Sequence, residues 1–210
     1  MTICFRTLLC LWVLSIAVTR CTIEKPTQYG TVPLLSLYYP LAADNWWVSR
    51  RVRVEGDTTG IDPVRFEIIR KEQISGWASY VGVWQPARDT SWLVLSSDEL
   101  RVYSHSPTDS SSYHVVLKLP LVVGDTWAYQ PSENDGLFAY VASRTESVVV
   151  PAGRFTGCLK VEVKESTGEV VLTCDFAPNV GMVHSRKAGP SGWDSELLEY
   201  HVAEESIDWP

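Results

Sequence analysis

The stretch LKVEVK, residues 159–164, alternates apolar and polar side chains with a period of two. Successive side chains of an extended strand point to opposite faces, so this pattern predicts a strand with one dry face and one wet face. The same alternation recurs in RVRVE (51–55), HVVLKL (114–119) and LLEYHV (197–202), the last with Leu197 on the wet side. No window of a dozen residues sustains the helical period of 3.6, so an all-β fold is predicted.

Turn sequences rich in Gly, Pro, Asn and Asp divide the chain at short intervals, which is typical of an antiparallel meander rather than of βαβ units. About a dozen strands cannot stay flat in one open sheet. We therefore predict a single-domain antiparallel meander curled into a barrel or half-barrel, with a sandwich as the second choice. The further predicted strands are residues 34–39, 64–71, 77–84, 92–96, 100–103, 137–150, 170–176 and 182–186.

Two stretches of eight residues echo each other: PLAADNWW (40–47) and PLVVGDTW (120–127). In each, Pro brings the chain in extended, Leu is free to bury, a small polar pair can turn tightly and Trp opens the next strand. The similarity stops after the Trp. This favours a single structural corner that occurs twice in one domain, rather than a duplication of whole domains. The alternative is a ligand platform built from Trp46, Trp47 and Trp127.

The first 21 residues, MTICFRTLLCLWVLSIAVTRC, have the layout of a secretory signal: a cation at Arg6, a short apolar run, then small or polar residues. The apolar run is too short to span a membrane. Cys21 is a candidate lipidation site, which would anchor the mature protein, and cleavage after Ala17 to release a free chain is the alternative. Export to the periplasm or cell surface is predicted either way.

Four parts of the chain are predicted. Residues 1–20 form a signal peptide, and residues 21–33 a linker or N-terminal extension. Residues 34–203 form a single β domain, and residues 204–210 an acidic C-terminal tail. The polar run at 104–114 is expected to be an exposed hairpin loop rather than a domain boundary.

The charge balance excludes one class of partner. Removing residues 1–20 leaves 16 basic and 25 acidic residues, a net charge of −9. An acidic surface repels phosphate backbones, and no run of Lys or Arg offsets it. Nucleic acid is therefore not an expected partner.

Cys158 and Cys174 flank a predicted hairpin that turns near Gly168. A two-residue turn pairs Cys174 with Val161, three positions from Cys158 and on the opposite face. A three-residue turn pairs Cys174 with Lys160, a diagonal from which a weak disulfide could form. A disulfide and two small buried thiols both stay open.

The sequence shows no grouping of residues that is typical of a catalytic or metal-binding site. The four histidines are scattered without metal-ligand spacing, and motifs of serine hydrolases, phosphate-binding loops and dinucleotide-binding loops are absent. Neighbouring carboxylates such as Asp98 and Glu99 would point to opposite faces of a strand. We predict no catalytic residue, metal site or cofactor, and do not expect an enzyme.

Five segments in order cover most of residues 38–200: YYPLAADNWWV, LPLVVGDTWAY, VPAGRFTGCLKV, DFAPNVGMV and ELLEY. They resemble the sequence motifs shared by a widespread group of uncharacterised bacterial secreted proteins and lipoproteins. The motifs P-L-x-x-G-x-x-W, V-P-A-G-x-F-x-x-C-L-K-V and A-P-x-V-G-x-V recur in that group. Asp44 stands where that group usually has Gly, so a tighter or more strained first corner is expected. The resemblance implies a β-rich envelope domain of unknown activity, without catalytic residues to carry over.

Two functions follow as hypotheses. The first is a non-enzymatic exported envelope domain that binds a lipid or other apolar molecule on a Trp-rich concave face. The second is a structural or protein-interaction module that meets an envelope protein through the loop at 104–114 or through the C-terminal tail with Trp209. Apolar side chains that line an open cavity would favour the first, and a dry face that is only packed core would disfavour it.

Overall fold

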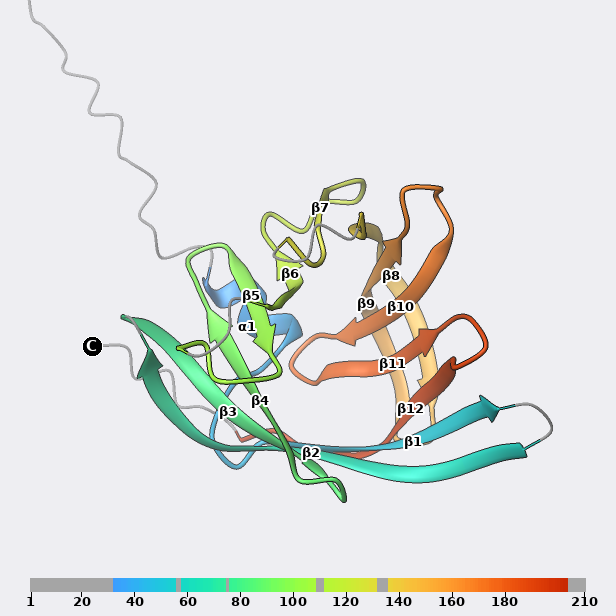
Figure 1. Cartoon of the computed structure of the whole chain (residues 1–210), viewed down its shortest axis with the longest axis horizontal. Helices are drawn as coiled ribbons and strands as arrows, with labels where there is room; N and C mark the ends of the chain where they lie inside the picture. The colour runs from blue at the N-terminus through green and yellow to red at the C-terminus, as the bar shows by residue number, and fades with distance from the viewer. Residues whose placement is uncertain (1–31, 56–57, 75, 109–111, 132–135, 204–210) are drawn as a thin grey trace, which may run out of the picture.

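Segments with two-residue alternation form strands in the computed structural model, which describes residues 32–55, 58–74, 76–108, 112–131 and 136–203 (Figure 1). The predicted signal peptide, Cys21 and the acidic tail with Trp209 lie outside the described residues. The elements are α1 (Val32–Tyr38), β1 (Trp46–Glu55), β2 (Thr58–Ile74), β3 (Trp77–Gln85), β4 (Asp89–Leu95), β5 (Glu99–Tyr103), β6 (His114–Lys118), β7 (Thr126–Ala128), β8 (Phe138–Val150), β9 (Gly153–Lys164), β10 (Val170–Ala177), β11 (Gly181–Lys187) and β12 (Trp193–His201).

The strands form one twelve-stranded sheet in the order β6-β5-β4-β3-β2-β1-β12-β11-β10-β9-β8-β7. Strands that are adjacent in sequence pair antiparallel, except for β6 and β7 at the two ends of the sheet, and β1 also pairs with β12. The two end strands meet, because Val115 N in β6 donates to Tyr129 O just after β7 at 2.8 Å. The sheet is thus a nearly closed barrel. The all-β meander and the barrel are confirmed, and the sandwich alternative is wrong.

Residues 34–39 were predicted as a strand, and they belong instead mainly to the short helix α1. Pro33 fits the first turn of a helix, where its missing N–H is not needed. Leu35 and Tyr38 stand three residues apart on one helix face and are 1% and 4% exposed. Asn179 N donates to Leu37 O at 2.6 Å and so satisfies a carbonyl near the helix end. A short apolar run fits either period, so packing decides here.

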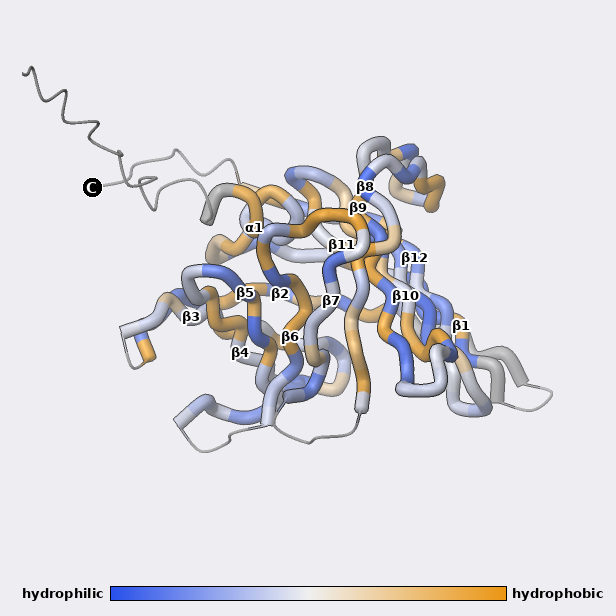
Figure 2. Tube along the Cα trace, turned by 90° about the horizontal axis from the view of Figure 1, so that it is seen from above, coloured by the Kyte–Doolittle hydropathy of each residue, from blue (hydrophilic) through white to orange (hydrophobic). Residues whose placement is uncertain are grey.

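Buried residues of α1 and the strands form the hydrophobic core, and the tube is more hydrophobic along these elements than at most of the turns around them (Figure 2). Leu197 corrects one expectation, since it is 0% exposed rather than on the wet face. Val48 pairs with Glu199 but Ser49 pairs with Leu197, which leaves Leu198 as an extra residue. Such a bulge reverses the alternation of the strand.

The two echoing stretches form the same corner twice, the first corner at residues 40–47 and the second corner at 120–127. Asp44 and Gly124 hold matching positions, and both have left-handed φ, 70° and 97°. The backbone strain expected from the missing glycine is therefore located at Asp44, which adopts the left-handed conformation with a side chain. The matching backbone hydrogen bonds are Asp44 N to Ile68 O (2.8 Å) and Gly124 N to Val141 O (3.0 Å), with return bonds from Ile68 N to Asn45 O (2.9 Å) and from Val141 N to Asp125 O (3.0 Å).

The tryptophans of the two corners are equivalent too. Trp47 pairs with Phe66 in β2 and Trp127 with Ala139 in β8, in each case two residues before the strand residue that bonds the corner. The leucines that follow the prolines, Leu41 and Leu121, are 7% and 0% exposed. The prediction of one structural device used at two corners is confirmed.

Candidate functional site

The predicted platform of Trp46, Trp47 and Trp127 does not form one surface. Trp47 and Trp127 are each 7% exposed, and their indole N–H groups donate to Val180 O at 2.6 Å and to Val115 O at 2.8 Å. Trp46 precedes Trp47 in β1 and so faces the other side of the sheet, where it stacks on His201. Two of the three indoles are core side chains with satisfied donors.

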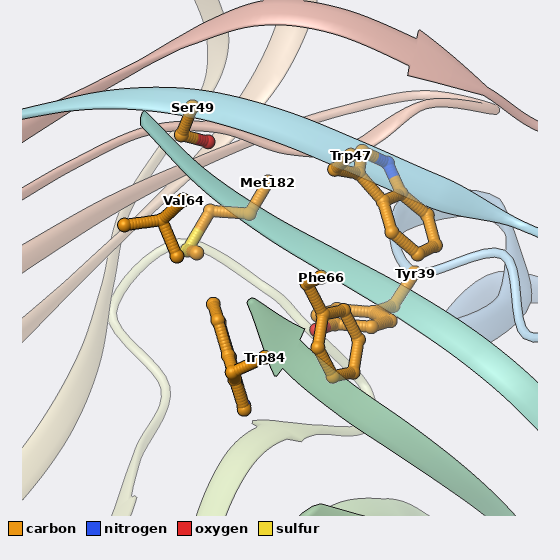
Figure 3. Close-up of a pocket in the computed structure, with 7 residues that line it drawn as sticks. All are labelled: Tyr39, Trp47, Ser49, Val64, Phe66, Trp84 and Met182. Carbon is orange, nitrogen blue, oxygen red and sulfur yellow. The ribbon is translucent and has the colours of Figure 1, made fainter. Parts of the chain in front are cut away.

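An aromatic cluster of Tyr39, Trp47, Phe66 and Trp84 fills the barrel beside β1. Ring centroids lie 6.2 Å apart for Tyr39 and Trp47, 6.0 Å for Trp47 and Phe66, and 4.5 Å for Phe66 and Trp84. These rings surround a hollow of only about 30 Å³ (Figure 3). That volume suits a water molecule. The aromatic cluster is therefore packed core and leaves no chamber for a lipid.

A larger groove of about 840 Å³ lies next to the aromatic cluster and shares Val64 and Trp84 with the hollow. Trp84 is half-buried, and its indole donates to Ser91 Oγ across the β3–β4 hairpin at 3.0 Å. The groove is lined by the apolar residues Pro63, Val64, Trp84, Pro86 and Ala87 together with polar residues that include Arg51, Arg53, Asp89, Thr90 and His105. Its lining thus suits a molecule with both apolar and polar parts.

Alternation along β1 explains why arginines line this groove. Arg51 and Arg53 follow Trp47 at even spacings, so they lie on the same face of the strand as the buried indole. Trp47 is covered by other rings, whereas Arg53 lies near the end of the strand and is exposed. The strand that supplies the core therefore also supplies two cations to the groove. No sequence pattern predicted this site, because its residues come from four strands, the β3–β4 turn and the turn after β5.

His184 forms a second polar centre, on β11. Its Nδ1 lies 3.0 Å from Asp175 Oδ2 and its Nε2 lies 3.0 Å from Asp194 Oδ1. The hydrogen bond to Asp175 is the main cause that raises the pKa of His184, burial opposes it, and Asp194 adds to the rise. The three side chains link β10, β11 and β12. Sequence inspection missed them because strand pairing, not spacing, brings them together.

Cys158 and Cys174 are free thiols in the structure. Cys174 pairs with Val161, the register expected from a two-residue turn, and so lies three positions from Cys158. Burial, together with the Asp175 charge, raises the pKa of Cys174 to about 12, and burial also raises the pKa of Cys158. The disulfide alternative does not hold in the structure, because the register separates the two sulfurs.

The described residues contain neither a candidate metal centre nor a helix suited to span a membrane. No group of three or more His, Cys, Asp and Glu side chains in the described part could hold a metal ion. Within the same residues, no helix combines the length and the apolar character needed to cross a membrane.

Comparison with known proteins gives similarity at the level of the fold. No family model matches the chain, and no curated protein matches it. A solved structure from Bacteroides fragilis, described as a "putative exported protein with YmcC-like fold", is 14% identical, with a TM-score of 0.48 over 79% of this chain and 99% of that chain. A "putative lipoprotein" from Parabacteroides distasonis is also 14% identical, with a TM-score of 0.46 over 79% of this chain and 98% of that chain.

Proposed function

We propose that this chain is a non-enzymatic exported domain of the cell envelope that binds an amphipathic small molecule or lipid in the groove beside Trp84. The N-terminal signal-like sequence supports export to the periplasm or cell surface, and Cys21 is the residue at which a lipid anchor would attach. The single observation that carries the binding role is the groove of about 840 Å³, whose lining combines apolar residues, Trp84 among them, with polar and charged ones.

The position of the ligand follows from what the barrel leaves open. The hollow within the aromatic cluster has room only for water. An apolar chain would therefore lie along the groove surface and not inside the barrel. Pro63, Val64 and Pro86 offer it a rigid apolar wall. Binding then depends on the groove itself rather than on rearrangement of the core.

A variant that fills the groove tests this proposal. Thr90 lines the groove and is half-buried, so Thr90→Trp places an indole where a ligand would lie. Thr145→Trp adds the same bulk at an exposed position of β8 outside the groove and is the matched control. Calorimetric titration with decanoate and with 1-decanol should show saturable binding of at least one probe to the native chain and to Thr145→Trp, and a loss of at least tenfold in Thr90→Trp.

Equal binding by both variants, at unchanged melting temperatures, would refute the groove as the site. The absence of binding by either probe to the native chain would refute an amphipathic ligand of this size. Native mass spectrometry of the chain purified from its own host gives an independent reading, because a co-purifying small molecule should be lost from Thr90→Trp.

One observation favours a second candidate function, a protein-interaction module. Val122 and Val123 at the second corner are 51% and 52% exposed, although both are apolar. Adjacent exposed valines on a rigid corner are suited to contact with an envelope protein. Cross-linking in the host should then capture a specific partner that Val122→Ser/Val123→Ser no longer captures, while decanoate binding stays the same.

A further inference from the structure

Three cations gather around Trp193 beside the groove. In the register of the sheet, Trp193 lies between Lys187 of β11 and Arg53 of β1. Side chains at directly opposite positions have Cβ atoms about 4.5–5.5 Å apart, so the side chains of both cations begin beside the indole. Arg51 adds a third, since its guanidinium carbon lies 4.8 Å from the Trp193 ring centroid. We name Lys187, Arg53, Arg51 and Trp193 the cationic patch.

Two of these cations have no ion-pair partner among the described residues. Within the described residues, neither Arg53 nor Lys187 forms an ion pair, and both side chains are exposed. Seven other cations in the described part of the chain form ion pairs: Arg50 with Glu196, Arg65 with Glu67, Arg70 with Glu72, Arg101 and Lys118 with Glu99, Lys160 with Glu146, and Lys164 with Glu162. In a chain with an excess of acidic residues, two neighbouring unpaired cations are available for an external anion.

Three acidic residues occur near the cationic patch. Asp89 lines the groove, and Asp62 lies opposite Arg51 in the register of β1 and β2. Arg51 is therefore assigned to holding Trp193 and not to the anion. Asp194 follows Trp193 and bonds His184 on the other face of β12.

We propose that the groove binds an anionic amphiphile whose carboxylate or phosphate group is held by Arg53 and Lys187. This inference rests on the proposed function and adds the chemical class of the ligand. Guanidinium and ammonium groups form charge-assisted hydrogen bonds with these anions. Arg53 lines the groove that also holds Trp84, so one ligand can place its head at the cationic patch and its chain on the apolar wall.

The test compares four probes on the full chain by calorimetry: decanoate, decyl phosphate, 1-decanol and inorganic phosphate. The variant Arg53→Gln/Lys187→Gln removes both unpaired cations, and Arg144→Gln/Arg154→Gln removes two charges from β8 and β9 as the control. We expect decanoate and decyl phosphate to bind the native chain at least tenfold more tightly than 1-decanol. The patch variant should lose this preference, the control should keep it, and added salt should weaken it.

The outcomes separate this inference from the proposed function. Equal affinity for decanoate and 1-decanol, both lost in Thr90→Trp, would overturn the anionic class while the groove stands. Inorganic phosphate that binds as tightly as decyl phosphate would support the anion site but overturn the amphiphile. A preference for decanoate that survives in Arg53→Gln/Lys187→Gln would overturn the assignment of these two residues, and binding of none of the four probes would overturn both proposals.

Discussion

At the residue scale, a missing side chain sets the packing of the aromatic cluster. A Cβ atom added at Gly82 of β3 would lie 2.2 Å from the Phe66 ring, far inside van der Waals contact. The ring of Phe66 thus occupies the space that any larger residue at position 82 would need. Glycine is required here for room rather than for backbone conformation.

Gly82→Ala should therefore destabilise the fold by about 1–3 kcal/mol, the usual cost of overpacking a core. Urea unfolding measures this loss. The double variant Gly82→Ala/Phe66→Leu should be more stable than the sum of the two single effects predicts, because the smaller side chain removes the clash. Simple additivity of the two changes would contradict the contact as described.

His184 makes stability depend on pH. Its pKa is raised in the folded chain by Asp175 and Asp194, so folding favours the protonated imidazole. This contribution is fully present below the ordinary histidine pKa of about 6.5, and it is lost as the pH rises through the higher pKa of the folded state. Hydrogen bonds to charged groups contribute ~1.5–3 kcal/mol.

His184→Gln should accordingly be less stable than the native chain at pH 5.5, with a difference that narrows toward pH 8.5. Urea unfolding at a series of pH values gives the two curves. His201→Gln is the control, because His201 stacks on Trp46 and lies at the end of β12. A difference that is constant across this pH range would argue against the ion pairs as its source.

At the scale of elements, the two corners offer a comparison inside one molecule. Gly124 and Asp44 adopt the same left-handed conformation, in which an L side chain costs roughly 1–2 kcal/mol. A Cβ at position 124 would meet no other atom within 4 Å, so a substitution there changes backbone strain alone.

Gly124→Ala should therefore lower the free energy of unfolding by about 1 kcal/mol, and Asp44→Gly should raise it or leave it unchanged. Chemical denaturation of the two variants side by side measures both signs. Two losses of similar size would mean that the Asp44 side chain contributes more than its backbone strain costs.

Prediction from sequence succeeded for the strands and failed where local and distant effects compete. Alternation located the strands because a strand with one wet face and one dry face has alternating polar and apolar residues in its sequence. It could not place α1, where an apolar run of one or two turns fits either period, nor Leu197, which a bulge moves to the dry face. The candidate site was not predictable, because Arg53, Trp84, Lys187 and Trp193 come from different strands and meet only through the register.

At the scale of the whole molecule, the barrel is one continuous meander with a seam between β6 and β7. Trp127 closes this seam, since its indole N–H donates to Val115 O in β6 while its ring packs in the core. The same side chain therefore belongs to the second corner and to the closure of the barrel.

Trp127→Ala should cost ~3–5 kcal/mol, the range for truncating a buried indole, and lower the melting temperature by several degrees. Hydrogen exchange should rise most in β6 and β7, because the seam opens first. Trp77→Ala, at a position 45% exposed, is the control and should have little effect. Unchanged exchange at the seam would show that Trp127 acts only through the core.

The pairing of β1 with β12 has a consequence for how the chain is made. The ribosome delivers β1 before the other strands of the sheet and β12 after them, so the edge of β1 that pairs with β12 stays free while β2 to β11 are made. An unpaired edge invites pairing with other chains, and charged side chains discourage it. The strand β1 carries three arginines, Arg50, Arg51 and Arg53. These charged side chains therefore also discourage pairing of the free β1 edge with other chains before β12 is made.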